Sequence, residues 1–109
     1  MAAEFDVVVF GATGFTGERV AAALHKLSAP GGAWQGVRWA IAGRSGEKLS
    51  RIKEKLPRLD AAHVILADVA DPATLRAMAA RTAVVMNATG PYRFYGEAVV
   101  EACIASRTE

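Results

Sequence analysis

The chain has 109 residues, of which 52% are hydrophobic and 22% are charged, and its formal net charge is +2. This length and apolar content predict one globular domain, residues 1–109, and exclude a disordered chain. The mildly basic charge argues against a nucleic acid as partner. A single cysteine excludes an internal disulfide framework and fits a reducing compartment, so we expect the cytoplasm. No apolar run approaches the roughly 20 residues of a membrane span.

An apolar run, a glycine-rich turn and an alanine-rich helix open the chain. The run over residues 7–10 is branched and apolar, which is typical of a buried parallel strand. Three glycines follow with the spacing G-x-x-G-x-x-G. Val20, Leu24 and Leu27 then form one helical stripe beside three alanines. A glycine pattern between a strand and a helix predicts a dinucleotide-binding turn.

Each of the three glycines has its own expected role. Gly11 lets the chain turn out of the strand, and Gly17 lets the helix approach the sheet closely. Gly14 leaves room for a pyrophosphate, and a side chain there would also be strained at any positive φ. The first N–H groups of the helix favour an anion, to which Thr13 and Thr16 could donate hydroxyl hydrogens. An ordinary strand-to-helix turn is the alternative, and the regular spacing makes it the weaker one.

The rest of the chain alternates between apolar runs and helical stripes. Further strands are expected over 38–42, 63–67 and 83–86, and further helices after 45, after 71 and over about 96–105. Asp71 and Pro72 have the residue types of a helix cap and first helical position. The alternation predicts an α/β, Rossmann-like fold, in which an open parallel sheet of four strands in the order 3-2-1-4 has helices on both faces. At this length the unit is short for a complete dinucleotide-binding domain.

In such a sheet a ligand binds at the carboxyl ends of the strands. An acidic residue after the second strand usually holds the free ribose hydroxyl of NAD(H). This chain instead has Arg44 and Ser45 there, with Lys48 one turn later. A guanidinium suits a phosphate, so we expect a 2′-phosphate, and NADP(H) rather than NAD(H) as cofactor. The alternative is the solvated basic face of a helix, which we favour for the cations beyond Lys48 and not for Arg44.

The ends of the third and fourth strands supply the remaining candidates. Asp68 could accept a hydrogen bond from the adenine amine and Val69 could pack on the ring. A turn-forming role for Asp68 is equally well supported. Ala88, Thr89 and Gly90 would pass under the nicotinamide ribose, where Gly90 has no Cβ to obstruct a ligand.

Three segments resemble the N-terminal NADP-binding region of saccharopine dehydrogenase-like oxidoreductases: VVVFGATGFTGERV, WAIAGRSGEKL and NATGPYRFYGEAVVEAC. That family includes the trans-acting enoyl reductases of bacterial lipid synthesis. The resemblance reaches Ala105 and implies a Rossmann fold, NADP(H), and an oxidoreductase parent in lipid or glycolipid metabolism, with association with membranes or lipid droplets left open. It implies cofactor roles for Phe15 and for positions already named: Gly11, Thr13, Gly14, Thr16, Gly17, Arg44 and Ala88 to Gly90. Family members continue into a second domain, so the resemblance identifies no proton donor here.

The remaining polar and aromatic residues are weaker candidates. Tyr92 and Tyr95 lack the Tyr-x-x-x-Lys arrangement of short-chain reductases. His25 and His63 are expected to be structural, because they lie away from the strand ends that face a ligand. No cluster of His, Cys and carboxylates has metal-ligand spacing, so we expect no metal. Two further residues are expected to pack: Cys103 in a helix and Trp34 in a Gly/Pro loop, where contact with a partner is the alternative.

Three functions fit these observations. The first is the cofactor-binding part of an NADP-dependent oxidoreductase, and the second is a non-catalytic nucleotide-binding module that works through a partner. The third is an inactive truncated product. The fourth strand has no fifth strand to pair with, so we expect self-association or pairing with a missing segment through its open edge.

Overall fold

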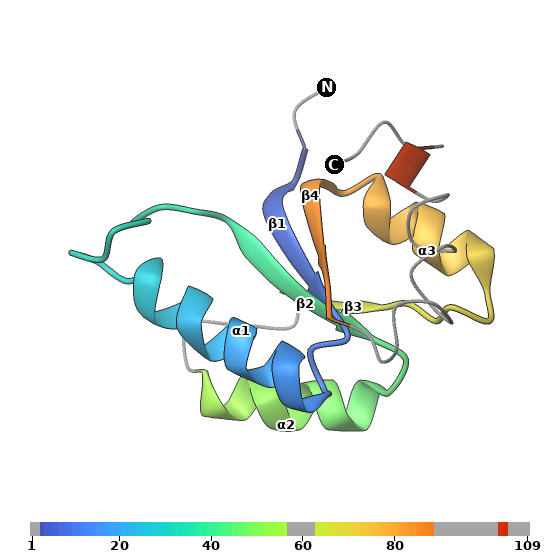
Figure 1. The fold of residues 1–109 in the computed structure, drawn as a ribbon, viewed down its shortest axis with the longest axis horizontal. Helices are drawn as coiled ribbons and strands as arrows, with labels where there is room; N and C mark the ends of the chain where they lie inside the picture. The colour runs from blue at the N-terminus through green and yellow to red at the C-terminus, as the bar shows by residue number, and fades with distance from the viewer. Residues whose placement is uncertain (1–2, 57–62, 89–102, 105–109) are drawn as a thin grey trace.

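The computed structural model describes residues 3–56, 63–88 and 103–104, and its centre is a parallel sheet. The strands are β1 (Phe5–Phe10), β2 (Trp39–Gly43), β3 (Val64–Leu66) and β4 (Thr82–Asn87). They pair in the order β3-β2-β1-β4, so the predicted order is confirmed (Figure 1). The strand bounds differ only slightly from the predicted ranges; β2, for example, begins and ends one residue later than 38–42.

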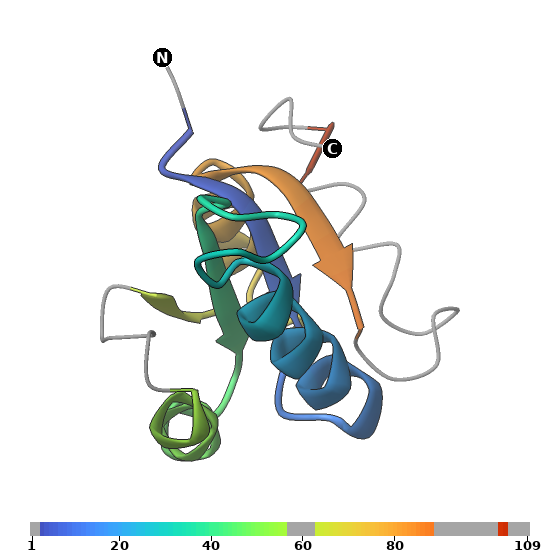
Figure 2. The same ribbon diagram turned by 90° about the vertical axis from the view of Figure 1, so that its left-hand side faces the viewer.

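Helices cover both faces of the sheet, as predicted. Helices α1 (Phe15–Leu27) and α2 (Gly46–Lys55) lie together on one face, and α3 (Pro72–Ala79) lies on the other (Figure 2). Successive side chains along a strand point to opposite faces of the sheet, so each strand contributes to the core on both faces. Val9 is buried with Leu24 and Leu49 on the α1–α2 face. Its neighbour Val8 is buried with Leu75 and Met78 on the α3 face. Full burial of each such side chain contributes about 1.5–3 kcal/mol.

The predicted helical stripes are the buried faces of their helices. In α2, Leu49 and Ile52 are buried, and Leu56 directly follows the helix in the same core cluster. In α3, the buried residues are Leu75, Met78 and Ala79.

The three helices begin in different ways. Ser45 caps α2, because its Oγ accepts a hydrogen bond of 3.3 Å from the backbone N–H of Lys48. Asp71 caps α3 through Oδ1, which accepts from Ala73 N at 3.2 Å, and Pro72 follows as predicted. At the start of α1 the cap position is Gly14, which has no side chain to accept a hydrogen bond. The N–H groups of its first turn therefore lack a side-chain cap.

Two arginine–carboxylate pairs fasten the start of the chain to the sheet. Arg38 Nη2 donates to Asp6 Oδ1 at 2.9 Å, and the backbone N–H of Arg38 donates to Asp6 Oδ2 at 2.9 Å. Arg81 holds both carboxylate oxygens of Glu4, at 2.9 and 3.0 Å, while its guanidinium lies 5.4 Å from the centre of the Phe5 ring. The hydrogen bond from Arg38 lowers the pKa of Asp6, and the one from Arg81 lowers the pKa of Glu4.

The expectation that Trp34 packs into the fold is wrong. Its side chain is 49% exposed, whereas Trp39 in β2 is 5% exposed and donates Nε1–H to Ser28 Oγ at 3.1 Å. The apolar side chain that this loop packs against the core is Val37, which directly precedes Arg38 and β2, and not Trp34.

His63 and Cys103, two further residues with predicted roles, lie within the described ranges. The ring of His63 faces Phe5 at 6.0 Å, which fits a structural role. Cys103 is helical and half-buried against the α3-side core, and that burial raises the pKa of its thiol. Apart from Cys103 and Ile104, the predicted helix over 96–105 lies outside the described residues, as do Tyr92 and Tyr95. In the described ranges no helix is long and apolar enough to cross a membrane, and no group of three potential ligands could hold a metal ion.

Candidate nucleotide-binding site

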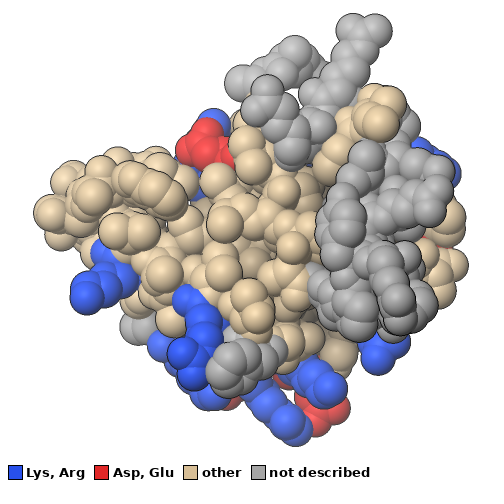
Figure 3. Space-filling model, in the orientation of Figure 1, with Lys and Arg blue, Asp and Glu red and all other residues tan. Residues whose placement is uncertain are grey.

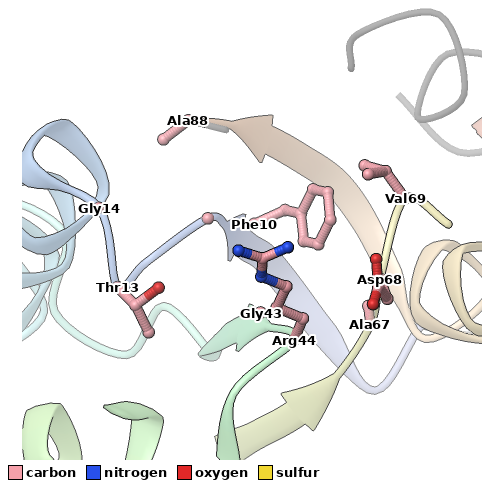
Figure 4. Close-up of a pocket in the computed structure, with 10 residues that line it drawn as sticks. Phe10, Thr13, Gly14, Gly43, Arg44, Ala67, Asp68, Val69 and Ala88 are labelled. Atoms are coloured by element: carbon pink, nitrogen blue, oxygen red, sulfur yellow. The ribbon is translucent and has the colours of Figure 1, made fainter. Parts of the chain in front are cut away.

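A cavity of about 210 Å³ lies where the carboxyl ends of the strands converge. Backbone hydrogen bonds hold these ends in register: Ala88 N donates to Phe10 O at 2.8 Å and Ala67 N donates to Gly43 O at 2.9 Å. The residues after each strand therefore meet at one edge of the sheet. The lining residues are Phe10, Gly11, Thr13, Gly14, Gly43, Arg44, Ala67, Asp68, Val69 and Ala88 (Figure 4).

The glycine turn forms one wall of this cavity. Gly11 has φ +85°, a conformation that side chains other than glycine's rarely adopt. A Cβ at Gly17 would overlap the carbonyl oxygen of Gly11 and would lie 2.8 Å from Ala12 Cα. Gly17 thus provides a close approach to the backbone of the turn, whereas the sequence predicted a close approach of the helix to the sheet.

Gly14 differs from the other two glycines. Its φ is −80°, so the strain that a side chain would suffer at a positive φ does not arise there; among these three glycines the positive φ belongs to Gly11. A Cβ at Gly14 would meet only Gly11 O, at an ordinary contact distance of 3.5 Å. The residue is exposed, lines the cavity and opens the uncapped helix α1. A side chain at this position would thus project into the space beside the helix N-terminus without harming the fold.

Arg44 supplies the positive charge of the site. It directly follows β2, its side chain is exposed, and Figure 4 shows its guanidinium projecting toward the centre of the cavity. None of the ion pairs between described residues includes Arg44. Its donors are therefore available to an anionic ligand, for which a planar guanidinium is well suited.

Asp68 forms a turn and also lines the cavity. Its Oδ1 accepts a hydrogen bond of 2.9 Å from Ala70 N, and its backbone carbonyl accepts from Asp71 N at 2.9 Å. These bonds form the turn that leads into α3. The same side chain lines the cavity beside Val69, and the hydrogen bonds among described residues engage only one of its carboxylate oxygens. A turn-forming Asp68 can thus still accept a hydrogen bond from a ligand.

The remaining sequence candidates lie elsewhere. Ser45 does not line the cavity, because its hydroxyl caps α2. Thr16, Gly17 and Lys48 are also outside the lining. The side chain of Phe15 and the residues Thr89 and Gly90 are not among the described parts of the chain.

Sequence reasoning missed three lining residues, Phe10, Gly43 and Ala67. Phe10 and Gly43 are the last residues of β1 and β2, and Ala67 directly follows β3. Their positions at the strand ends could have indicated them, but none of the three has a polar side-chain group that suggests ligand binding. They contribute apolar surface to the cavity lining.

These features together fit a phosphate-bearing nucleotide. The glycine turn leaves backbone space that a Cβ would fill, α1 presents an uncapped N-terminus, and Arg44 is unpaired among the described residues. With the strand order β3-β2-β1-β4, they define a Rossmann-type dinucleotide-binding domain. Residues 7–109 match the family described as saccharopine dehydrogenase NADP-binding domain, and the chain belongs to this family. NADP(H) is the cofactor of the family, as the sequence predicted.

Curated relatives agree with this assignment. The chain is 45% identical over 107 residues to the human saccharopine dehydrogenase-like oxidoreductase, covering 92% of the chain and 25% of the relative. It is 44% identical over 107 residues to the trans-acting enoyl reductase of Mycobacterium bovis (strain BCG / Pasteur 1173P2), covering 97% and 24%. It is 43% identical over 105 residues to a lipid droplet localized protein of Caenorhabditis elegans, covering 92% and 24%. The chain thus spans about a quarter of the length of these relatives.

A solved structure shows the same fold. Apo saccharopine dehydrogenase (L-Glu forming) from Saccharomyces cerevisiae superposes with a TM-score of 0.73 at 22% identity, covering 95% of this chain and 20% of that one. At this identity the likeness establishes the fold alone.

Proposed function

We propose that this chain is the cofactor-binding part of an NADP(H)-dependent oxidoreductase that acts on a lipid-linked substrate in the cytoplasm. The observation that carries the cofactor half of the proposal is the guanidinium of Arg44, which faces the cavity and forms no ion pair with another described residue. No acidic residue directly follows β2 in the sequence. The lipid-linked substrate is supported by the enoyl reductase among the relatives.

We propose a position along the cavity for each part of the cofactor. Gly11, Gly14 and the N-terminus of α1 would hold the pyrophosphate, to which the Thr13 hydroxyl could donate. Arg44 would bind the 2′-phosphate. The adenine would rest against Asp68 and Val69, and Ala88 would face the nicotinamide ribose together with Thr89 and Gly90. Secondary contributions are proposed for Ser45, which directly follows Arg44 in sequence, and for Thr16 and Lys48, which lie in the first turns of α1 and α2.

Bound NADPH would supply a hydride, whereas the protein must supply a proton donor and a wall for the substrate. Among the described lining residues, only Arg44 and Asp68 carry titratable side chains, and both are assigned to the adenosine half. We therefore propose that the donor comes from the part of the protein that corresponds to the remaining three-quarters of the relatives.

The outer edge of β4 fits the same proposal. Among the described strands, β4 pairs only with β1, so one row of its N–H and C=O groups faces away from the sheet. Such an edge is a template for another strand. We propose that it pairs with a further segment of the protein or, in the isolated chain, with a second copy.

Titration of the chain with NADPH and with NADH tests the cofactor assignment. We expect NADPH to bind more tightly, by about one to two orders of magnitude, because a charge-assisted hydrogen bond contributes about 1.5–3 kcal/mol. Circular dichroism of the same sample verifies the fold. A folded chain that binds neither cofactor contradicts the proposal, and equal binding of the two refutes the 2′-phosphate site.

A further inference from the structure

The loop between α1 and β2 exposes a large aromatic side chain. Trp34 is 49% exposed, and its neighbours Pro30 and Ala33 are also exposed. No charged residue occurs from Leu27 to Val37, although 22% of the whole chain is charged. This loop enters β2 at its amino end, whereas the nucleotide cavity lies at the carboxyl ends of the strands. The loop is thus a separate surface.

Hydrogen bonds hold this loop in a defined shape. Trp34 N donates to Leu27 O at 2.9 Å, and Val37 N donates to Trp34 O at 3.1 Å. Gly31 N donates to Gln35 Oε1 at 3.0 Å across the tip. Ser28, at the base, accepts from the buried Trp39. Because both backbone groups of Trp34 are engaged, the exposed indole stands on a fixed support.

Basic residues flank the loop. The last turns of α1 and α2 contain His25 and Lys26, and Lys53 and Lys55, respectively. Both helices end on the side of the molecule from which the loop projects (Figures 1 and 2). Figure 3 shows this region as an uncharged lobe with Lys and Arg side chains mainly below it and acidic side-chain atoms at its upper edge. Lys55 pairs with Glu18 at 3.2 Å, but the ion pairs between described residues include neither Lys26 nor Lys53.

We propose that Trp34, together with Lys26 and Lys53, docks the domain on the surface of an anionic phospholipid bilayer. Tryptophan prefers the interface between water and lipid, because its ring is apolar and its N–H remains hydrogen-bonded. Lysines near an anionic leaflet each add attraction that is screened by salt. The cofactor cavity stays accessible in this arrangement, so the proposal does not rest on the function of that site.

The chemistry of the loop favours a lipid surface over a protein. A specific protein interface buries about 800 Å² on each partner and uses directed hydrogen bonds. Here the exposed side chains are one indole, a proline and small residues, and the amide oxygen of Gln35 already accepts from the loop backbone. Shallow insertion beside cations needs no directed partner.

Tryptophan fluorescence tests the proposal on the 109-residue chain. The chain has two tryptophans, of which only Trp34 is exposed. We expect emission to shift to the blue and quenching by acrylamide to fall when vesicles of phosphatidylcholine and phosphatidylserine are added. Vesicles of phosphatidylcholine alone should give a much weaker response. In Trp34→Phe, the remaining emission comes from buried Trp39 and should not respond to either vesicle.

Vesicle co-sedimentation separates the two contributions. Trp34→Ala should weaken binding about tenfold. Lys26→Gln and Lys53→Gln should each weaken binding about fivefold and reduce its salt dependence. Two variants serve as matched controls and should bind as the wild type does. Leu66→Ala removes a side chain that is 61% exposed at β3, and Arg76→Gln removes a cation from α3 on the other face of the sheet.

Three results would overturn the proposal. The first is equal binding by Trp34→Ala and wild type. The second is loss of binding in the two control variants as well as in Trp34→Ala. The third is a blue shift that depends on protein concentration without vesicles, because it would assign the loop to contact between copies of the chain.

Discussion

The carbonyl group of Gly11 lies against Gly17 on the side where any other residue would carry its Cβ. This contact joins the first turn of α1 to the end of β1 through backbone alone. The two glycines do different work, because Gly11 adopts a positive φ and Gly17 provides clearance. Neither role needs a ligand, so both glycines stabilise the turn itself.

Replacement of Gly17 by alanine should therefore damage the fold. The added methyl group would overlap backbone atoms of Gly11 and Ala12, which cannot move aside as a flexible side chain would. We expect a loss of about 1–3 kcal/mol in the free energy of unfolding, or more. Chemical denaturation of Gly17→Ala and wild type measures this loss of stability. Ala22→Gly, on the exposed side of α1, is the control for a substitution in the same helix away from the turn. Unchanged stability would show that α1 can shift away from the turn.

Replacement of Gly14 by valine should leave the fold intact and remove cofactor binding. Its φ of −80° suits valine, and its Cβ meets only Gly11 O. We expect a cost of about 1 kcal/mol from the poorer helix cap. Because the methyl groups would occupy the space proposed for the pyrophosphate, NADPH affinity should fall by more than about tenfold. Normal binding by folded Gly14→Val would mean that this turn does not hold the phosphates.

Arg44→Ala should abolish the preference for NADPH. Titration of both cofactors should show NADPH affinity falling by about one to two orders of magnitude and NADH affinity changing little. Lys48→Ala should have a smaller effect, because Lys48 does not line the cavity. Lys53→Ala, at the far end of α2, is the control for loss of one positive charge. The same preference in Arg44→Ala and wild type would remove Arg44 from the site.

Local periodicity made most of the fold predictable. The stripe of Leu49 and Ile52 is a property of the sequence alone, and strict alternation with right-handed crossovers left few possible strand orders. The burial of Trp34 was predicted wrongly, because a Gly/Pro loop has no periodicity from which to infer a buried face. Glycine spacing also does not say which glycine adopts the left-handed conformation, which in this turn is Gly11 and not Gly14.

The site was harder to predict than the fold, and strand register is the reason. Phe10 and Ala88 both line the cavity and are joined by the hydrogen bond from Ala88 N to Phe10 O, and no local pattern encodes that pairing between strands. Ser45 illustrates a second difficulty. A serine before a helix can cap it or bind a phosphate, and here its hydroxyl accepts from Lys48 N. Arg44 and Asp68 were found because they are charged residues at strand ends, although Asp68 also forms a turn.

Acid should destabilise the protein through Asp6 and Glu4. The hydrogen bond from Arg38 lowers the pKa of Asp6, and that from Arg81 lowers the pKa of Glu4. A group with a depressed folded pKa stabilises the protein above its unfolded pKa of about 4, and this stability is lost as pH falls through the folded value. The melting temperature should thus decrease as the pH is lowered from about 5 to about 2. Asp6→Asn should show a smaller fall; an identical pH profile would assign the acid sensitivity to other carboxylates.

The isolated 109-residue chain should associate and should not turn over substrate. Residues 84 and 85 of β4 are only half-buried, Met86 is 39% exposed, and among described strands only β1 pairs with β4. An unpaired edge of this kind promotes association, and a lysine on it opposes association. Light scattering should therefore show a mass that rises with concentration in wild type and rises less in Met86→Lys. In the same samples the NADPH absorbance should stay constant with carbonyl and enoyl substrates, because the described lining residues include no proton donor for the nicotinamide end. Monomeric protein that oxidises NADPH only when substrate is present would contradict both expectations. It would also direct the search for a donor to Thr89, Tyr92 and Tyr95.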